Sequence, residues 1–176
     1  YFFAEDKYTK FQVSSEETPG AGYPAPVIGA NWPGLPAAFA TPDAAMLWNS
    51  GVAYFFKGDE YVSFDVANDR VHPGYPRKIK DYWPGWPANF TGIDAALSWN
   101  DSTCYFFKGD EYIAFDIPNN RVHPGYPRKI IGNWSGWPAD FVNADCAVKW
   151  NNGYAYIFKG DKYIRFSISS DKLDGG

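Results

Sequence analysis

One segment that occurs three times constrains this chain more than any other feature. It reads DAALSWNDSTCYFFKGDEYIAF from Asp94 to Phe115, and close copies run from Asp43 to Phe64 and from Asp145 to Phe166. The starts at 43, 94 and 145 give a period of 51 residues both times. A fixed period of about 20–50 residues is typical of repeat architectures. We therefore predict one supersecondary unit that is used several times.

Each repeat contains three legible strands and one irregular element. Asp94 to Trp99 is short and apolar, with small alanines after the Asp, and predicts a tightly packed inner strand. Cys104 to Lys108 and Glu111 to Asp116 flank a Lys-Gly-Asp turn and predict a hairpin. Arg121 to Gly136 is rich in Pro and Gly, which predicts an outer edge strand or a short helical turn. This pattern favours a propeller blade over a solenoid of hairpins, because small residues suit inner strands that converge on one axis.

The chain opens inside a repeat. Residues Tyr1–Phe11 match Tyr54–Phe64 at an offset of 53, and Trp32–Pro36 matches Trp83–Pro87 at an offset of 51. The opening strand of the first repeat and the closing segment of the last are missing, so we expect a trimmed mature form or an incomplete sequence. The predicted blades cover residues 1–42 (partial), 43–93, 94–144 and 145–176.

Composition excludes two classes of protein. The formal net charge of −4 disfavours a nucleic-acid binder, which normally carries a basic stripe. No run of 18 or more apolar residues is present, so we predict no membrane span. Aromatic residues make up 20% of the chain, a proportion that suits sheets packed face to face and leaves rings available for ligands.

The cysteines and the glycosylation sequons bear on the compartment. Cys104 and Cys146 replace alanines of the matching repeats, so they are either two small buried thiols or a disulfide between neighbouring blades. Three N-x-S/T sequons, at Asn89, Asn100 and Asn133, favour a glycosylated surface and an extracellular or secretory location.

The sequence gives little support to catalysis. Its two histidines, His72 and His123, occupy equivalent positions of successive repeats, and no metalloprotease, nucleophile-elbow or phosphate-loop motif is present. We expect a protein that is not an enzyme. The histidines are either solvated turn residues or, alternatively, ligands of a haem iron.

The aromatic loops have two interpretations. They either seal the gaps between adjacent blades or stack on the faces of sugars, where repeated weak sites would add up as avidity. The residues concerned are Trp83, Trp86, Trp134 and Trp137, with Tyr75 and Tyr126 just upstream.

The combined pattern D-A-A, W-N, Y-F-F-K-G-D-x-Y, P-G-Y-P and W-P-G resembles the haemopexin-like repeat. The likeness covers essentially the whole chain. It looks closer to the free-standing hemopexin-fold proteins of fungi, plants and microbes, some described as lectins, than to the domain attached to matrix metalloproteinases. It implies an all-β, four-bladed β-propeller with a cation-filled central channel.

The resemblance also implies a set of ion ligands. The backbone carbonyls of Asp43, Asp94 and Asp145 would ring a Ca²⁺ or Na⁺ ion. A second ion would face the carbonyls of Ala45, Ala96 and Ala147, and backbone N–H groups would face a Cl⁻ ion. Calcium prefers oxygen ligands, which agrees with such a ring.

These observations together predict a non-enzymatic ligand-binding propeller. We expect a carbohydrate-binding, lectin-like protein with a structural cation, which binds glycans or another small ligand and can form a homo-oligomer. The alternatives are a haem- or polyamine-binding storage or stress protein and a structural protein-interaction module. In founding members of the family the haem site lies between two propellers, and this chain has one.

Overall fold

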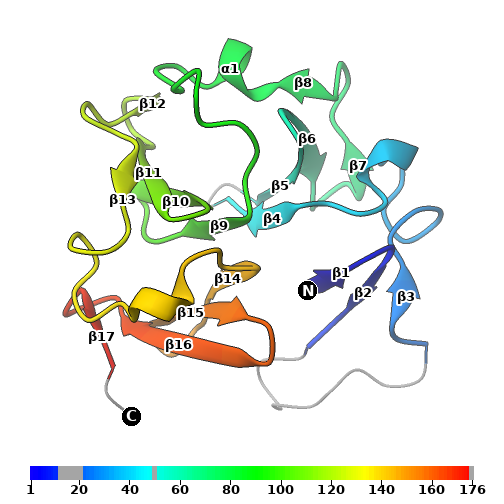
Figure 1. Ribbon diagram of the computed structural model, residues 1–176. Helices are drawn as coiled ribbons and strands as arrows, with labels where there is room; N and C mark the ends of the chain where they lie inside the picture. The colour runs from blue at the N-terminus through cyan, green and yellow to red at the C-terminus, as the bar shows by residue number, and fades with distance from the viewer. Residues whose placement is uncertain (12–21, 49–50, 175–176) are drawn as a thin grey trace.

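Four antiparallel sheets lie in a ring in the computed structural model, which describes residues 1–11, 22–48 and 51–174 (Figure 1). The prediction of an all-β, four-bladed propeller is confirmed. Blade 1 consists of β1 (Phe2–Ala4), β2 (Lys7–Thr9) and β3 (Ala25–Pro26). Blade 2 consists of β4 (Ala44–Leu47), β5 (Val52–Lys57), β6 (Glu60–Asp65), β7 (Arg70–Val71) and β8 (Arg77–Lys78).

The next two blades repeat this order of strands. Blade 3 consists of β9 (Ala95–Ser98), β10 (Thr103–Lys108), β11 (Glu111–Asp116), β12 (Arg121–Val122) and β13 (Arg128–Lys129). Blade 4 consists of β14 (Cys146–Lys149), β15 (Tyr154–Lys159), β16 (Lys162–Ser167) and β17 (Lys172–Leu173). The short helices are η1 (Ala37–Phe39), α1 (Ile79–Tyr82) and η2 (Ala139–Phe141).

The predicted hairpin forms in each of the three matched repeats. In blade 3 it pairs β10 with β11 from Thr103↔Asp116 to Lys108↔Glu111. The turn needs a left-handed residue, which Gly109 supplies with φ of 62°. The hairpin is the central part of the blade, with the inner strand on one side and short edge strands on the other.

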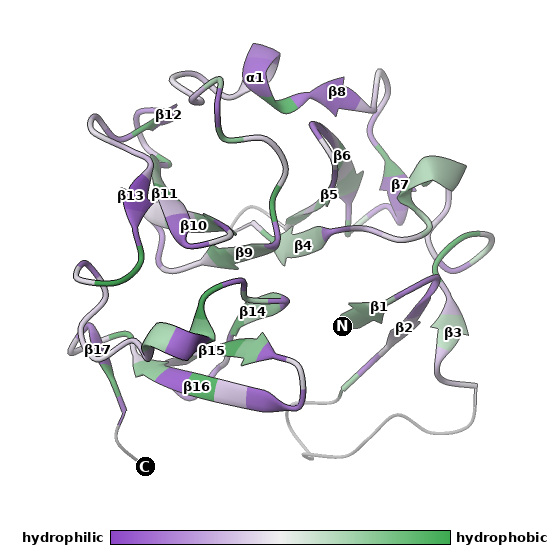
Figure 2. Cartoon of the chain, viewed as in Figure 1, coloured by the Kyte–Doolittle hydropathy of each residue, from purple (hydrophilic) through white to green (hydrophobic). Residues whose placement is uncertain are grey.

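The inner strands carry the small residues that the sequence pattern predicted. Strand β9 lies between β4 and β14, and its residues Ala95 and Ala96 are almost fully buried. Figure 2 shows the resulting contrast: the inner strands are coloured hydrophobic, whereas β8, β13 and α1 at the rim are coloured hydrophilic. Close packing around one axis therefore explains the alanines.

The Pro-rich segment forms the rim of blades 2 and 3. In blade 2 it supplies β8, which pairs with β6 at Tyr61↔Arg77, and then the single turn of α1. Both predicted outcomes, an edge strand and a short helical turn, therefore occur. The strands stay short because proline cannot donate a ladder hydrogen bond.

Buried aromatic residues form three cores, each shared by two neighbouring blades. The core between blades 2 and 3 contains Phe56 and Phe106, and the core between blades 3 and 4 contains Phe107 and Phe166. A third core joins blades 1 and 2 around Phe55. A tryptophan of the rim loop lies inside each of these cores.

Candidate functional site: the axial pocket

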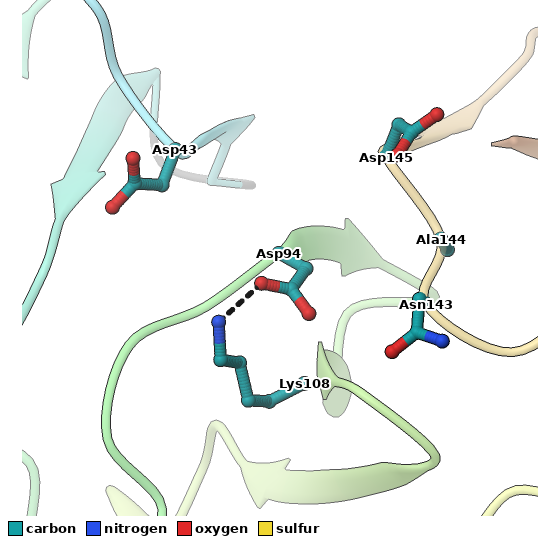
Figure 3. A pocket seen from close by; sticks show the side chains of 6 residues that line it. All are labelled: Asp43, Asp94, Lys108, Asn143, Ala144 and Asp145. Carbon is teal, nitrogen blue, oxygen red and sulfur yellow. Dashed lines mark hydrogen bonds and ion pairs between the residues drawn. The ribbon is translucent and has the colours of Figure 1, made fainter. Parts of the chain in front are cut away.

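The aspartates that precede the three inner strands line one pocket at the axis (Figure 3). Asp43 comes just before β4, Asp94 before β9 and Asp145 before β14. The pocket has a volume of about 500 Å³, and Lys108, Asn143 and Ala144 complete its lining. The structure therefore brings together the three aspartates that the sequence singled out.

Each aspartate side chain is held by the hairpin tip of its own blade. Asp94 Oδ1 accepts a hydrogen bond from Lys108 Nζ at 2.5 Å, and its Oδ2 accepts one from the Gly109 N–H at 2.8 Å. Asp43 accepts in the same way from Lys57 at 2.7 Å and from the Gly58 N–H at 2.8 Å. In blades 2 and 3 the aspartate that precedes the inner strand therefore contacts the Lys and the Gly of the Lys-Gly-Asp turn.

The third aspartate departs from this pattern. Asp145 Oδ2 accepts from the Gly160 N–H at 2.7 Å, but Lys159 donates instead to the carbonyl oxygen of Asp140 at 2.6 Å. Among the described residues no lysine forms an ion pair with Asp145. Three carboxylates at the pocket are therefore matched by two lysine partners, which leaves the pocket with a surplus of negative charge.

The pocket suits a hard cation better than an anion. Its carboxylates are partly accessible, with the side chains of Asp43 and Asp94 exposed by 38% and 27%. Within residues 1–11, 22–48 and 51–174, no group of three or more His, Cys, Asp or Glu side chains could hold a metal. A cation would therefore depend on backbone carbonyl oxygens, as the predicted ring of Asp43, Asp94 and Asp145 requires.

The residues of the predicted second ring belong to the inner strands themselves. Ala45, Ala96 and Ala147 belong to β4, β9 and β14, two residues after the respective aspartates. Their carbonyls remain predicted ligands of a second ion. The sequence did not identify Lys108 or Asn143 as lining the axial pocket. For the lysine, the repeated Lys-Gly-Asp turn is the signal that could have located it.

Three of the four tryptophans of the aromatic loops belong to the core. Trp83, Trp134 and Trp137 are only 5%, 6% and 6% exposed. Trp86 is half-buried and donates from Nε1 to the Phe90 carbonyl at 2.9 Å. Of the two interpretations, sealing between blades describes the three buried rings, whose faces are not available for stacking on a sugar.

The two tyrosines of these loops have arginines on their rings. The Arg77 guanidinium lies 4.5 Å from the centroid of Tyr75, and that of Arg128 lies 4.6 Å from the centroid of Tyr126. Burial, and a hydrogen bond in which the Tyr61 hydroxyl donates to Tyr75, raise the pKa of Tyr61 far above its ordinary value. These rings therefore fasten the rim to the hairpin, and the structure does not present them as open stacking platforms.

The two histidines lie on different blades and in different surroundings. His72 Nδ1 lies 2.9 Å from the Oγ of Ser63, which is buried, and His72 Nε2 lies 4.0 Å from Asp65 Oδ2. At the equivalent position in blade 3, His123 lies opposite Ala114, which has no hydroxyl. Both follow an edge strand, as expected of turn residues, and haem ligation stays a prediction.

Both cysteines are free thiols, so the predicted alternative of a disulfide is wrong. Burial raises the pKa of Cys104 well above its ordinary value, and burial raises that of Cys146 to about 11. The sequon residues Asn89, Asn100 and Asn133 are all exposed, so their glycosylation stays a prediction. No helix of the described chain has the length and apolar character needed to cross a membrane.

Comparison with known proteins identifies relatives of this chain. A family model described as Hemopexin matches residues 42–88 and 93–139. Matrix metalloproteinase-21 of Xenopus laevis is 30% identical over 186 residues, covering 98% of this chain and 29% of the relative. Neutrophil collagenase of Homo sapiens is 28% identical over 146 residues, covering 83% of this chain and 29% of the relative. The chain thus spans less than a third of the length of these relatives. The predicted likeness to the haemopexin-like repeat is confirmed, and matrix metalloproteinases are among the relatives of this chain.

Solved plant structures share the fold. A hemopexin fold protein from cow pea superposes with a TM-score of 0.76 at 24% identity, covering 99% of this chain and 85% of that one. A Cicer arietinum albumin described as showing hemagglutination gives 0.64 at 25% identity, with coverage of 77% and 65%. A plant lectin with two metal binding sites from Cicer arietinum gives 0.69 at 24% identity, with coverage of 99% and 81%.

Proposed function

This chain belongs to the Hemopexin family, and from that premise we propose that it is a non-enzymatic propeller that binds carbohydrate and holds a cation in its axial pocket. The observation that carries the proposal is the convergence of Asp43, Asp94 and Asp145 on one pocket with more carboxylates than lysine partners. Two Cicer arietinum proteins of the same fold, an albumin described as showing hemagglutination and a lectin with two metal binding sites, support the same proposal.

The donor set favours calcium or sodium. The pocket offers oxygen atoms and no thiolate or imidazole ligand among its lining residues, and hard cations prefer such oxygen donors. The carbonyl oxygens of the three aspartates would hold the ion, since their carboxylates are engaged by the hairpin tips. The cation would then join the inner strands of neighbouring blades.

The mouth of the pocket also offers groups that recognise hydroxyls. The Asn143 amide and the Lys108 ammonium line it, and both residues are exposed. Small-ligand sites are concave and use a few placed polar groups for specificity. We place the carbohydrate here and not on the tryptophan loops, because most of those rings are buried.

Calcium titration of chelator-treated protein tests the cation. Calcium at one hundred times its Kd should stabilise the fold by about 2.7 kcal/mol, because it binds only the folded state. For a chain of this size that is a rise in Tm of roughly 5–11 °C by differential scanning fluorimetry. Asp145→Asn should weaken the effect, whereas Asp171→Asn, in the β16–β17 turn outside the pocket, should leave it intact. A melt insensitive to both calcium and sodium would refute the cation.

A glycan array tests the carbohydrate. Asn143 has φ of 62°, so Asn143→Gly removes the amide and keeps the backbone conformation. This variant should bind at least about tenfold more weakly, since a hydrogen bond worth about 1.4 kcal/mol is tenfold in affinity. Asn120→Gly, with φ of 49° in a distant turn, is the matched control. A blank array together with no sugar-inhibited haemagglutination would contradict the proposal.

The surplus of negative charge favours one further candidate, a polyamine. A cationic chain of amines matches a pocket lined by Asp43, Asp94 and Asp145. Spermine should then compete with calcium in the same titration. Competition without any glycan signal would favour the polyamine over the carbohydrate, and no competition would exclude it.

A further inference from the structure

The rim of blade 2 differs from the rims of its neighbours at position 82. The equivalent positions of blades 1 and 3, each 51 residues away, are Asn31 and Asn133. Each asparagine ties down its rim turn by donating from Nδ2 to a backbone carbonyl, at 3.0 and 2.9 Å. Blade 2 has Tyr82 there, an aromatic side chain without the amide that makes this hydrogen bond. The rim of blade 2 therefore carries a ring where the other two rims carry a local hydrogen bond.

Tyr82 is held at the surface by the residues around it. It ends the single turn of α1, whose first residue, Ile79, is buried in the core, as is the following Trp83. The Trp83 N–H donates to the Ile79 carbonyl at 2.9 Å, which fixes the backbone of the turn. Tyr82 itself is 52% exposed. Figure 1 shows β8 and α1 following each other along the outer rim of blade 2, away from the axis.

One face of the Tyr82 ring is covered by an arginine. The Arg77 guanidinium lies over Tyr82, with 4.6 Å between Cζ and the ring centroid, and over Tyr75 at 4.5 Å. Its Nε donates to the Gly74 carbonyl at 3.1 Å, and its backbone pairs with Tyr61 of β6. Arg77 is therefore already ordered, so a ligand that bound it would lose little affinity to fixing the side chain.

The charge of Arg77 is also uncompensated by contact. The neighbouring Lys78 pairs with Asp59 at 2.8 Å and with Glu60 at 3.3 Å. Within residues 1–11, 22–48 and 51–174, Arg77 forms no ion pair. A guanidinium binds a carboxylate through two parallel N–H donors. Since only the Nε donor has a partner in the described chain, the Nη donors of Arg77 are available for such a group.

We infer that Arg77 and Tyr82 form a binding site for a sugar that carries a carboxylate, with the carboxylate on the Nη groups of Arg77 and the sugar ring on the open face of Tyr82. A tyrosine ring supplies a flat apolar surface with a polar tip, which suits a sugar face. That the anion is carried by a sugar rests on the proposed carbohydrate binding. No residue of the axial pocket takes part in this site.

Charge limits the ligand to a singly charged one. The site offers one guanidinium, because the side chains of Lys80 and Asp81 in α1 oppose each other in charge and Lys78 is engaged by two carboxylates. The whole chain has a formal net charge of −4, which repels phosphates and polysulfated chains. A single carboxylate, as in a uronic acid, matches this balance.

Blade 3 has half of this site. The Arg128 guanidinium lies 4.6 Å from the centroid of Tyr126, and its Nε donates to the Gly125 carbonyl at 3.3 Å, as in blade 2. The second ring is missing, however, because Asn133 occupies the position of Tyr82. We therefore expect one site per chain, and blade 3 supplies matched controls.

Isothermal titration calorimetry of the 176-residue chain with methyl glucuronide tests the site, with methyl glucoside as the neutral probe. Arg77→Gln should weaken glucuronide binding at least about tenfold and leave the affinity for the glucoside unchanged, because only the glucuronide offers a carboxylate. Tyr82→Asn should weaken glucuronide binding roughly three- to tenfold. Arg128→Gln is the matched control and should leave the affinity unchanged.

Three results would overturn the inference. The first is a glucuronide affinity no higher than that for the glucoside, and the second is an affinity that Tyr82→Asn does not change. The third is equal competition by inorganic phosphate, which would show a plain anion site. Because asparagine is the residue of blades 1 and 3 at this position, Tyr82→Asn should fold, and thermal melts check this.

The rim site and the axial pocket can fail separately. Asn143→Gly removes an amide that lines the axial pocket and should leave glucuronide binding intact. If this variant lost glucuronide binding while Tyr82→Asn kept it, the sugar would lie in the pocket, and the rim site would be refuted. If neutral glycans failed to bind while the glucuronide bound in a manner dependent on Tyr82, only the pocket proposal would be refuted.

Discussion

Replacing Trp134 by Ala should show how much one enclosed tryptophan contributes to the ring of blades. Trp134 is 6% exposed, and six aromatic rings have their centroids within 5.0–5.6 Å of it. They come from blade 3, from the rim loop and, in the case of Phe166, from blade 4. The substitution therefore opens a cavity at the seam between two blades.

The expected cost is large. Trp→Ala in a core typically lowers the free energy of unfolding by about 3–5 kcal/mol, because the transfer of the side chain and the remaining cavity both contribute. In a chain of this size each kcal/mol lowers Tm by about 2–4 °C, so we expect a decrease of roughly 6–20 °C. Tyr163→Ala, at a side chain that is 60% exposed, should cost no more than about 0.5 kcal/mol.

Thermal and urea unfolding followed by near-UV circular dichroism measure this difference. Free indole should raise the Tm of Trp134→Ala more than that of the unmodified chain, because an apolar cavity of this kind can bind a small aromatic molecule. If Trp134→Ala cost about as little as Tyr163→Ala, the buried tryptophan would not hold the seam between blades 3 and 4.

Three further predictions concern single groups. Trp137→Phe should lower the free energy of unfolding in urea less than Trp86→Phe does. The reason is that the buried Nε1 of Trp137 has no hydrogen-bond partner, whereas that of Trp86 donates to the Phe90 carbonyl. A larger decrease for Trp137→Phe would contradict this. Cys104 and Cys146 should resist a thiol reagent in the native protein at pH 8 and both react in denaturant, since burial raises both pKa values; rapid native labelling of Cys104 would refute its burial. Hydrogen bonds from Asn68 lower the folded pKa of Asp65 below its unfolded value. The contribution of Asp65 to stability is therefore present above the unfolded pKa and is lost as pH falls through the folded pKa. The Tm of Asp65→Asn should fall less steeply with decreasing pH than that of the unmodified chain, and an equal fall would contradict this role of Asp65.

The fold was predictable because each blade repeats the same local chemistry. Small residues at Ala95 and Ala96 and the turn at Gly109 follow from packing and backbone rules that act within a few residues. The number of blades followed from the resemblance and the period together. Because these rules act within a single repeat, the same residues recur at equivalent positions in all three copies, and the recurrence makes the strands and turns recognisable in the sequence.

The role of the aromatic loops could not be predicted in the same way. Whether Trp134 is buried depends on rings such as Phe166, which belong to the next blade and lie 32 positions along the chain. The hydrogen bonds of the Asp94 carboxylate could not be predicted either, because Lys108 and Gly109 become its neighbours only when the hairpin folds back. Contacts between distant segments decide both cases, and a periodic pattern does not report them.

The aspartate contacts and the tryptophan contacts act over different distances along the chain. Asp94 bonds to Gly109 inside one blade, so this contact forms without any other blade, whereas Trp134 joins two blades. Stability then behaves as a sum of blade terms and nearest-neighbour terms, as in linear repeat proteins. Each of the three described cores holds one such tryptophan, Trp32, Trp83 or Trp134, between two neighbouring blades. In Trp134→Ala, amide hydrogens of blades 3 and 4 should consequently exchange faster, while those of blades 1 and 2 keep their protection.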